Sequence, residues 1–280
     1  MKNFNKLVSL LVLPLLLVGC IQVETIIRLK ADGSGTIEKT VLVSREFINM
    51  MGMMKTLFQS DSTGEDSAED PFDFDDEETL RANASKLGVG VRFLSAEKID
   101  TDKLEGVKAI YAFSDITQVR IDPGMTGDIP SMDDEDAPES SREEYADIHF
   151  RKGNPARLVI TFPREEDKDA PDEMESDTLS LEEDEDSGMG RRFKSMMKDA
   201  RITLKFQIEG RISETNATFR DGSEVTLIDL EFAKFMDNLD AFNKLQSSKN
   251  LPFETRRQLM ADIPGVKIEL NDEVEIAFKP

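Results

Sequence analysis

The stretch that decides the fold is residues 21–44, with the sequence IQVETIIRLKADGSGTIEKTVLVS. Its first nine residues alternate between apolar and polar side chains almost without exception, which is the pattern of a half-buried β-strand. The run DGSG at residues 32–35 supplies residues that tolerate positive φ in a tight turn, and apolar side chains resume at Ile37, Val41 and Val43. We therefore predict a β-hairpin here.

The rest of the chain repeats the same two periodicities. Ser44 can cap a helix over residues 47–58, whose apolar positions follow helical spacing. Further strands are expected at residues 89–98, 107–119, 147–151, 157–162, 202–208, 212–219, 225–229, 266–270 and 274–278, and further helices at residues 80–87, 232–242 and 254–260. The fold class that this indicates is α+β, in which antiparallel hairpins form a sheet that packs against a few amphipathic helices, interrupted by disordered acidic loops.

Upstream of the hairpin, residues 1–19 have the character of a secretory signal. Lys2 and Lys6 precede an apolar run over residues 7–18, which is too short to span a bilayer comfortably. The run ends in Leu17, Val18, Gly19 and Cys20, a tetrapeptide that resembles the bacterial lipobox. The resemblance implies that a lipid is attached to Cys20 and that the chain is cleaved before it.

Cys20 is the one cysteine of the chain, so no internal disulfide is possible. One fatty chain anchors a protein marginally, whereas two or three anchor it almost permanently, so we expect a membrane partner through this lipid anchor. Residue 21 is Ile rather than the Asp that signals inner-membrane retention in enterobacterial lipoproteins. The expected location is therefore the bacterial cell envelope, with the outer membrane facing the periplasm favoured over the inner membrane.

The charge balance excludes one broad class of function. The chain has 35 Lys and Arg against 57 Asp and Glu, a net charge of −22, which becomes −24 once Lys2 and Lys6 are removed with the signal. A nucleic acid would be repelled, so we expect no nucleic-acid partner. The acids concentrate at residues 60–78, 128–144 and 165–187. Such segments bury too little apolar surface to offset the entropy of ordering, so we interpret them as disordered insertions.

Several short motifs resemble the LppM-type domain of bacterial lipoproteins. They are the lipobox running into a strand, the turn at residues 32–35, AFSDIT at 112–117, LVITFP at 158–163 and DGSEVT at 221–226. The resemblance covers roughly residues 20–230 and implies an anchored extracytoplasmic α+β module with lipid or envelope interactions and no known catalytic residues. Residues 231–280 would add a helix and a hairpin to the same domain; the alternative is two α+β lobes, 20–163 and 188–280.

No catalytic, cofactor or metal residue can be assigned. A serine hydrolase needs a G-x-S-x-G elbow and a histidine base, but the elbow is absent and His149, the one histidine, alternates with apolar neighbours in a strand. The acidic run at residues 73–78 has Glu78 where an EF-hand needs its glycine. Thioether sulfurs can bind Cu(I), but at helical spacing they more often fill a core; the methionines in question are Met50, Met51, Met53, Met54, Met196 and Met197. One basic cluster could touch anionic headgroups but more simply balances the neighbouring acids; it consists of Arg191, Arg192, Lys194, Lys198, Arg201 and Lys205.

The function that we predict from the sequence is therefore non-enzymatic. The protein would be a membrane-anchored envelope lipoprotein that binds a protein, a lipid or another apolar ligand, with a pocket near the helices at residues 47–58 and 232–242. The alternatives are a carboxylate-based envelope hydrolase and an acidic lipoprotein that binds calcium weakly. Two carboxylates facing each other in one cleft would favour the hydrolase.

Overall fold

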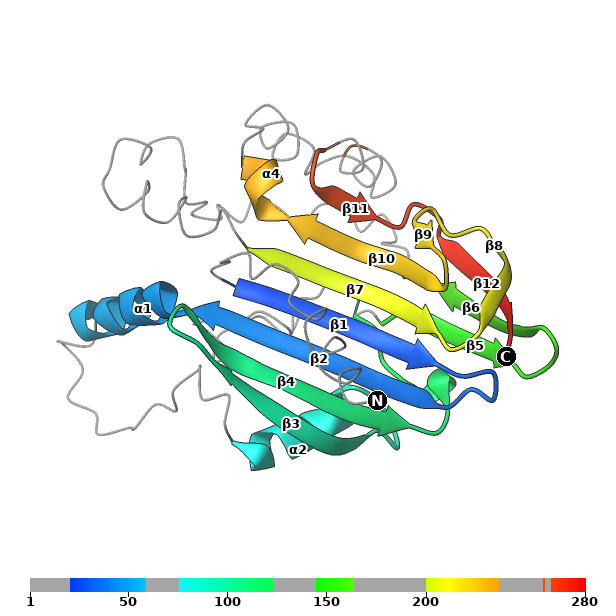
Figure 1. The fold of residues 1–280 in the computed structure, drawn as a ribbon, viewed down its shortest axis with the longest axis horizontal. Coiled ribbons are helices and arrows are strands. Elements are labelled where there is room, and N and C mark those ends of the chain that lie inside the picture. The colour runs from blue at the N-terminus through cyan, green and yellow to red at the C-terminus, as the bar shows by residue number, and fades with distance from the viewer. Residues whose placement is uncertain (1–20, 59–75, 123–144, 164–199, 237–258, 260–262) are drawn as a thin grey trace, which may run out of the picture.

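Two β-sheets of unequal size make up most of the computed structural model (Figure 1), which describes residues 21–58, 76–122, 145–163, 200–236, 259 and 263–280. The large sheet has the strand order β11-β10-β7-β1-β2-β4-β3, with β9 paired to β10, and the small sheet has the order β5-β6-β12-β8. The strands of the large sheet are β1 (Ile21–Leu29), β2 (Gly35–Ser44), β3 (Arg92–Asp100), β4 (Leu104–Phe113), β7 (Arg201–Ile208), β9 (Arg220–Asp221), β10 (Glu224–Glu231) and β11 (Val266–Ile268). Those of the small sheet are β5 (Asp147–Arg151), β6 (Ala156–Thr161), β8 (Arg211–Thr215) and β12 (Glu273–Lys279).

The predicted hairpin is confirmed as β1 and β2. The two strands pair antiparallel from Ile21 opposite Val43 to Leu29 opposite Gly35. In the turn, Gly33 adopts a φ of +84°, and the Asp32 carboxylate accepts hydrogen bonds from the backbone N–H and the hydroxyl of Ser34, at 2.9 and 2.7 Å. These hydrogen bonds hold the pKa of Asp32 below its usual value. The local turn chemistry therefore sets the register of the hairpin.

The hairpin lies at the centre of the large sheet, because β7 pairs with the free side of β1. This pair is parallel, with Gln22 opposite Arg201 and Leu29 opposite Ile208. The sequence-based expectation of antiparallel pairing is therefore wrong for this one pair of strands, β1 and β7. Strands so far apart in the chain can pair in either direction, and no local turn decides between them.

The small sheet covers one face of the large sheet and encloses the main core. Buried and exposed side chains alternate along the strands of both sheets. The buried ones meet in a single apolar cluster, which includes Ile27, Leu29, Phe206, Leu158, Ile160, Ile276 and Phe278. Strand β8 belongs to this small sheet. The strand expected at residues 212–219 ends at Thr215 and pairs with β12, so the strand that pairs with β10 across the turn is the short β9.

Three helices are described, and they lie at the margins of the large sheet (Figure 1). The helix α1 (Arg45–Phe58) begins as expected, since the Ser44 hydroxyl accepts a hydrogen bond from the N–H of Phe47 at 3.1 Å. Helix α2 (Glu77–Lys86) packs beside β3, and α4 (Phe232–Met236) follows β10. The α+β expectation holds in a coarser form: the fold is dominated by sheets, and the second sheet rather than the helices covers most of the core.

Several predicted boundaries change. The acidic insertion at residues 60–78 ends earlier, because Asp76 is the N-cap of α2 and Glu77 and Glu78 form its first turn. Residues 114–119 are not strand, since β4 ends at Phe113 and the short 3₁₀ turn η2 (Ile116–Gln118) follows. Residues 60–75, the other two acidic insertions, residues 237–242 of one predicted helix and most of another at residues 254–260 lie outside the described residues.

Candidate functional site

A hollow of about 590 Å³ lies on the exposed side of the small sheet. It is lined by Thr117, His149, Phe150, Arg151, Arg157, Val159 and Glu275. These residues come from η2 and from three neighbouring strands, β5, β6 and β12. The volume falls within the range of small-molecule sites. We call this set of residues the hollow.

The strand register explains why cationic side chains meet in the hollow. Arg151 lies directly opposite Arg157 across β5 and β6, and His149 lies opposite Val159. Residues two apart on a strand share a face, so His149 and Arg151 project to the same side. The Cβ atoms of directly opposed residues lie about 5 Å apart, and like charges at opposed positions disfavour the pairing.

The two arginines of the hollow are weakly neutralised. Arg157 has two carboxylates near it, Glu214 and Glu275, but each of these ion pairs is 3.9 Å long, beyond hydrogen-bonding distance. Within the described part of the chain, the guanidinium of Arg151 has no ion-pair partner. His149 contacts the Asp147 carboxylate at 3.2 Å and is largely exposed. The two arginines of the hollow therefore carry charge that no short ion pair takes up within the described part of the chain.

The hollow has a fixed place relative to the central hairpin. Phe150 packs against the β1–β2 turn so closely that a Cβ atom added at Gly33 would lie 2.8 Å from the Phe150 ring. The N–H of Ile116, next to Thr117, donates to the Gly33 carbonyl at 2.9 Å. The hollow therefore lies at the turn end of β1, whereas Ile21 lies at the opposite end. At about 3.3 Å per residue, β1 separates the two ends by roughly 26 Å.

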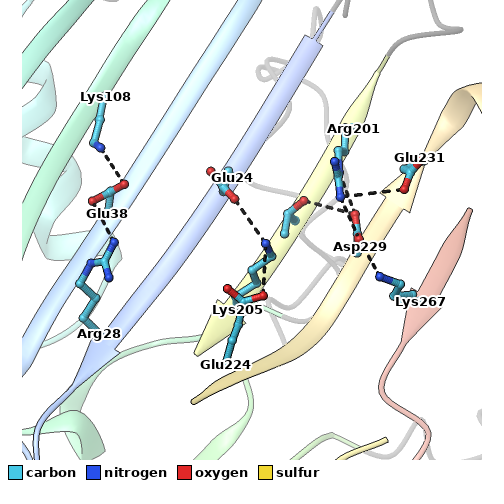
Figure 2. A network of polar contacts seen from close by, with 11 residues as sticks. Glu24, Arg28, Glu38, Lys108, Arg201, Lys205, Glu224, Asp229, Glu231 and Lys267 are labelled. Atoms are coloured by element: carbon cyan, nitrogen blue, oxygen red, sulfur yellow. Dashed lines mark hydrogen bonds and ion pairs between the residues drawn. The ribbon is translucent and has the colours of Figure 1, made fainter. Parts of the chain in front are cut away.

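A second charged feature crosses the polar face of the large sheet (Figure 2). We call it the charge band; it consists of Arg28, Glu38 and Lys108, then Glu24, Lys205 and Glu224, then Arg201, Asp229, Glu231 and Lys267. The band holds five cations and five carboxylates, and each one has an oppositely charged neighbour. Because these charges neutralise one another, the band offers little attraction to an added ion, in contrast to the hollow.

Asp229 is the buried member of the charge band, with its side chain 4% exposed. It accepts two hydrogen bonds from Arg201, at 2.9 and 3.0 Å, and lies 3.4 Å from Lys267. A bulge in β10 between Thr226 and Ile228 places Asp229 on the polar face. Strict alternation from Val225 would have turned the carboxylate into the apolar core.

These contacts shift the ionisation of both partners. Burial opposes the charged form of Asp229, but the hydrogen bonds and charge of Arg201, together with Lys267, outweigh it and lower the pKa of the carboxyl below its usual value. The hydrogen bond with Asp229 raises the pKa of Arg201. The pair is therefore ionised throughout the neutral range and stabilises the fold there.

We expect this stabilisation to disappear in acid. Because the pKa of Asp229 is lowered in the folded state, its contribution is complete above the unfolded value near 3.8 and is lost as the pH falls through the lower folded value. Urea unfolding of the wild type and of Asp229→Asn should show a gap in unfolding free energy at pH 7 that narrows below pH 3.8. A gap that stays constant down to pH 2 would contradict the lowered pKa of Asp229. Because both proteins contain the same other acids, the titration of those acids cancels in the difference between the two unfolding free energies.

Most residues that the sequence singled out lie away from the hollow or outside the described part of the chain. The lipobox residues Leu17, Val18, Gly19 and Cys20 lie outside it, as do Met196, Met197 and the basic residues Arg191, Arg192, Lys194 and Lys198. Arg201 and Lys205 are described, and both belong to the charge band. Of the methionines on α1, Met50 packs beside the buried Phe47, whereas Met53 is 70% exposed.

The metal and hydrolase alternatives both need acidic or metal-ligating side chains gathered in one place. Among the described residues, no group of three or more His, Cys, Asp or Glu side chains is placed to hold a metal ion. Asp76, from the acidic run considered for calcium, accepts hydrogen bonds from the N–H groups of Glu78 and Thr79 as a helix cap. The hollow is lined by one carboxylate, that of Glu275, within the described part.

Comparison with known proteins shows a weak structural similarity and no family match. No family model matches the chain, and no curated protein matches it. Among solved structures, the chain is similar to the folded domain of Mycobacterium tuberculosis LppM, determined by NMR, with 11% identity and a TM-score of 0.32 over 94% of this chain and 92% of that one. The score is too low to indicate a shared fold, so this similarity does not establish the family.

None of the helices within the described ranges is both long and apolar enough to cross a bilayer.

Proposed function

We propose that the protein is a lipid-anchored lipoprotein of the bacterial cell envelope whose folded body is a non-enzymatic binding module. The lipobox ending at Cys20 supports the anchor. We place the protein on the outer membrane, facing the periplasm, because Ile rather than Asp follows Cys20.

The observation that carries the proposal is the arrangement of the two ends of β1. The lipidated residue would directly precede Ile21, the first residue of β1, so the sheet follows the anchor without a linker. The hollow lies at the other end of the same strand, beside Gly33. A body held at Ile21 has the hollow at the end of β1 that is further from the anchor, where we expect it to meet ligands of the periplasm.

The apolar end of the molecule lies beside the anchor. Phe47 of α1 packs on Ile21, Val23 and Val43, while Met53, further along the same helix, is exposed to solvent. We predicted an apolar binding site near this helix, whereas the hollow lies at the opposite end of β1. We therefore assign ligand binding to the hollow rather than to α1.

The anchor is tested by replacing Cys20 with serine in cells grown with radiolabelled palmitate. We expect the wild-type protein to carry the label and to begin at Cys20 by intact mass. Cys20→Ser should lose the label completely and retain Met1, because cleavage of lipoprotein signals follows lipid attachment. Ser9→Ala, a substitution within the apolar run of the signal, serves as the matched control and should remain labelled. A wild-type protein that retains Met1, or that carries no lipid, would refute the proposal.

A further inference from the structure

We propose that the hollow binds a small organic oxyanion, a phosphate or carboxylate group attached to an apolar body, through Arg151 and Arg157. The inference deepens the proposed function and rests on it. It specifies the ligand as anionic, whereas the sequence alone suggested an apolar one.

The geometry supplies the donors that such a ligand needs. A guanidinium offers a planar fork of N–H groups that matches the two oxygens of a phosphate or carboxylate. Arg151 and Arg157 occupy directly opposed positions on β5 and β6. One anion reaches both once the Arg157 side chain turns from its long contacts with Glu214 and Glu275 toward β5. The 3.9 Å contacts of Arg157 with Glu214 and Glu275 leave its hydrogen-bonding capacity largely unused.

A bound anion would relieve the repulsion between the two opposed arginine positions. Like charges at directly opposite positions in a sheet repel each other, and the cations of the charge band avoid this by pairing with carboxylates. Within the described part of the chain, Arg151 has no such partner. A bound oxyanion would supply the missing charge between the two guanidinium groups.

The acidic character of the whole chain does not prevent binding. Charges separated by more than about 8 Å are largely screened at physiological ionic strength, so the two arginines dominate at contact distance. The net charge of −22 acts mainly on the approach of the ligand from afar.

The remaining walls indicate an apolar body on the ligand. The half-buried Val159 lies next to the Arg157 position and opposite His149 on this face, and a volume of about 590 Å³ greatly exceeds that of a bare phosphate. The position of the hollow, roughly 26 Å along β1 from the anchor end, favours a free small molecule over a lipid headgroup of the anchoring membrane.

The test is calorimetric titration of the full-length, acylated protein in a neutral detergent with phenyl phosphate, inorganic phosphate and phenol. We expect saturable binding of phenyl phosphate, weaker binding of inorganic phosphate and no binding of phenol. Arg151→Gln and Arg157→Gln should each weaken phenyl phosphate binding about ten- to hundredfold, the effect of losing a charge-assisted hydrogen bond. Arg92→Gln is the matched control, because Arg92 is exposed on β3 and its loss changes the net charge equally.

A second measurement separates binding from stability. Without ligand and at low salt, Arg151→Gln should unfold at the same urea concentration as the wild type or at a higher one, because it removes like-charge repulsion. A variant that binds less tightly but is no less stable identifies a ligand site rather than a structural contact.

Three outcomes would overturn the inference. They are absence of phenyl phosphate binding, equal weakening by Arg92→Gln, and binding of anionic phosphatidylglycerol vesicles through Arg151 without binding of phenyl phosphate. All of these leave the palmitate labelling of Cys20 unaffected, so a failure of this inference is distinguishable from a failure of the anchored-lipoprotein proposal.

Discussion

Arg201→Met is expected to lower the free energy of unfolding by about 3 kcal/mol, because it removes the main partner of a buried carboxylate. Asp229 would keep Lys267, at 3.4 Å, and a long contact with the Thr203 hydroxyl, at 3.5 Å. Neither replaces the paired hydrogen bonds that the guanidinium donates. Urea denaturation at pH 7 measures the loss.

Replacing Asp229 should cost less unfolding free energy than replacing Arg201. The Arg201 side chain is 43% exposed, so water can solvate it when Asp229 is replaced by asparagine, and that change should cost about 1–2 kcal/mol. The double variant Arg201→Met with Asp229→Leu should regain much of the loss, because apolar side chains can replace an ion pair at little cost. If Asp229→Asn proved as costly as Arg201→Met, the asymmetry that we infer from burial would be wrong.

Arg28→Met is the control within the same charge band. Its partner Glu38 lies 3.7 Å away and keeps a shorter contact with Lys108, at 2.8 Å. Loss of such a half-exposed pair should cost no more than about 1 kcal/mol. The difference between the two arginines therefore tests burial rather than the mere presence of an ion pair.

Phe278→Ala is expected to destabilise the protein by about 3–5 kcal/mol, the usual cost of removing a fully buried aromatic ring. Phe278 has no exposed surface and lies on β12, an inner strand of the small sheet. Its ring contacts that of Phe150, with the centroids 6.4 Å apart. The substitution should also loosen the wall of the hollow, because Phe150 would lose its packing partner.

The neighbouring residue on the same strand provides the control for Phe278. Lys279 is exposed, and Lys279→Ala should change the stability by less than about 0.5 kcal/mol. Both variants are compared by urea denaturation. A cost below 1 kcal/mol for Phe278→Ala would show that the two sheets are not packed against each other as described.

Local features of the fold could be predicted from the sequence because neighbouring residues determine them. The β1–β2 hairpin follows from alternation and a glycine turn, and the start of α1 follows from the Ser44 cap. The helix expected at residues 80–87 ends within one residue of the observed end of α2. Each depends on a few consecutive residues. The parallel pairing of β1 with β7 and the packing of the second sheet depend on contacts between distant segments, which periodicity does not encode.

The candidate site was missed for a related reason. The alternation that places His149 and Arg151 on one face was visible, and it correctly predicted the strand that carries them. That Arg151 faces Arg157 depends on the register across the turn at residues 152–155, and Glu275 joins the hollow from a strand far along the chain. Asp229 was hidden by the bulge in β10, which breaks the alternation on which the prediction relied.

The central place of β1 also determines how the body resists a mechanical load. Tension applied at Ile21 along the strand axis acts on the hydrogen bonds to β2 on one side and to β7 on the other, over nine and eight residue pairs. Both rows are loaded in shear, so many bonds share the force, whereas a strand pulled sideways from an edge would yield one bond at a time. A molecule anchored through this strand can therefore bear a pulling force from the membrane without losing its strand pairing one hydrogen bond at a time.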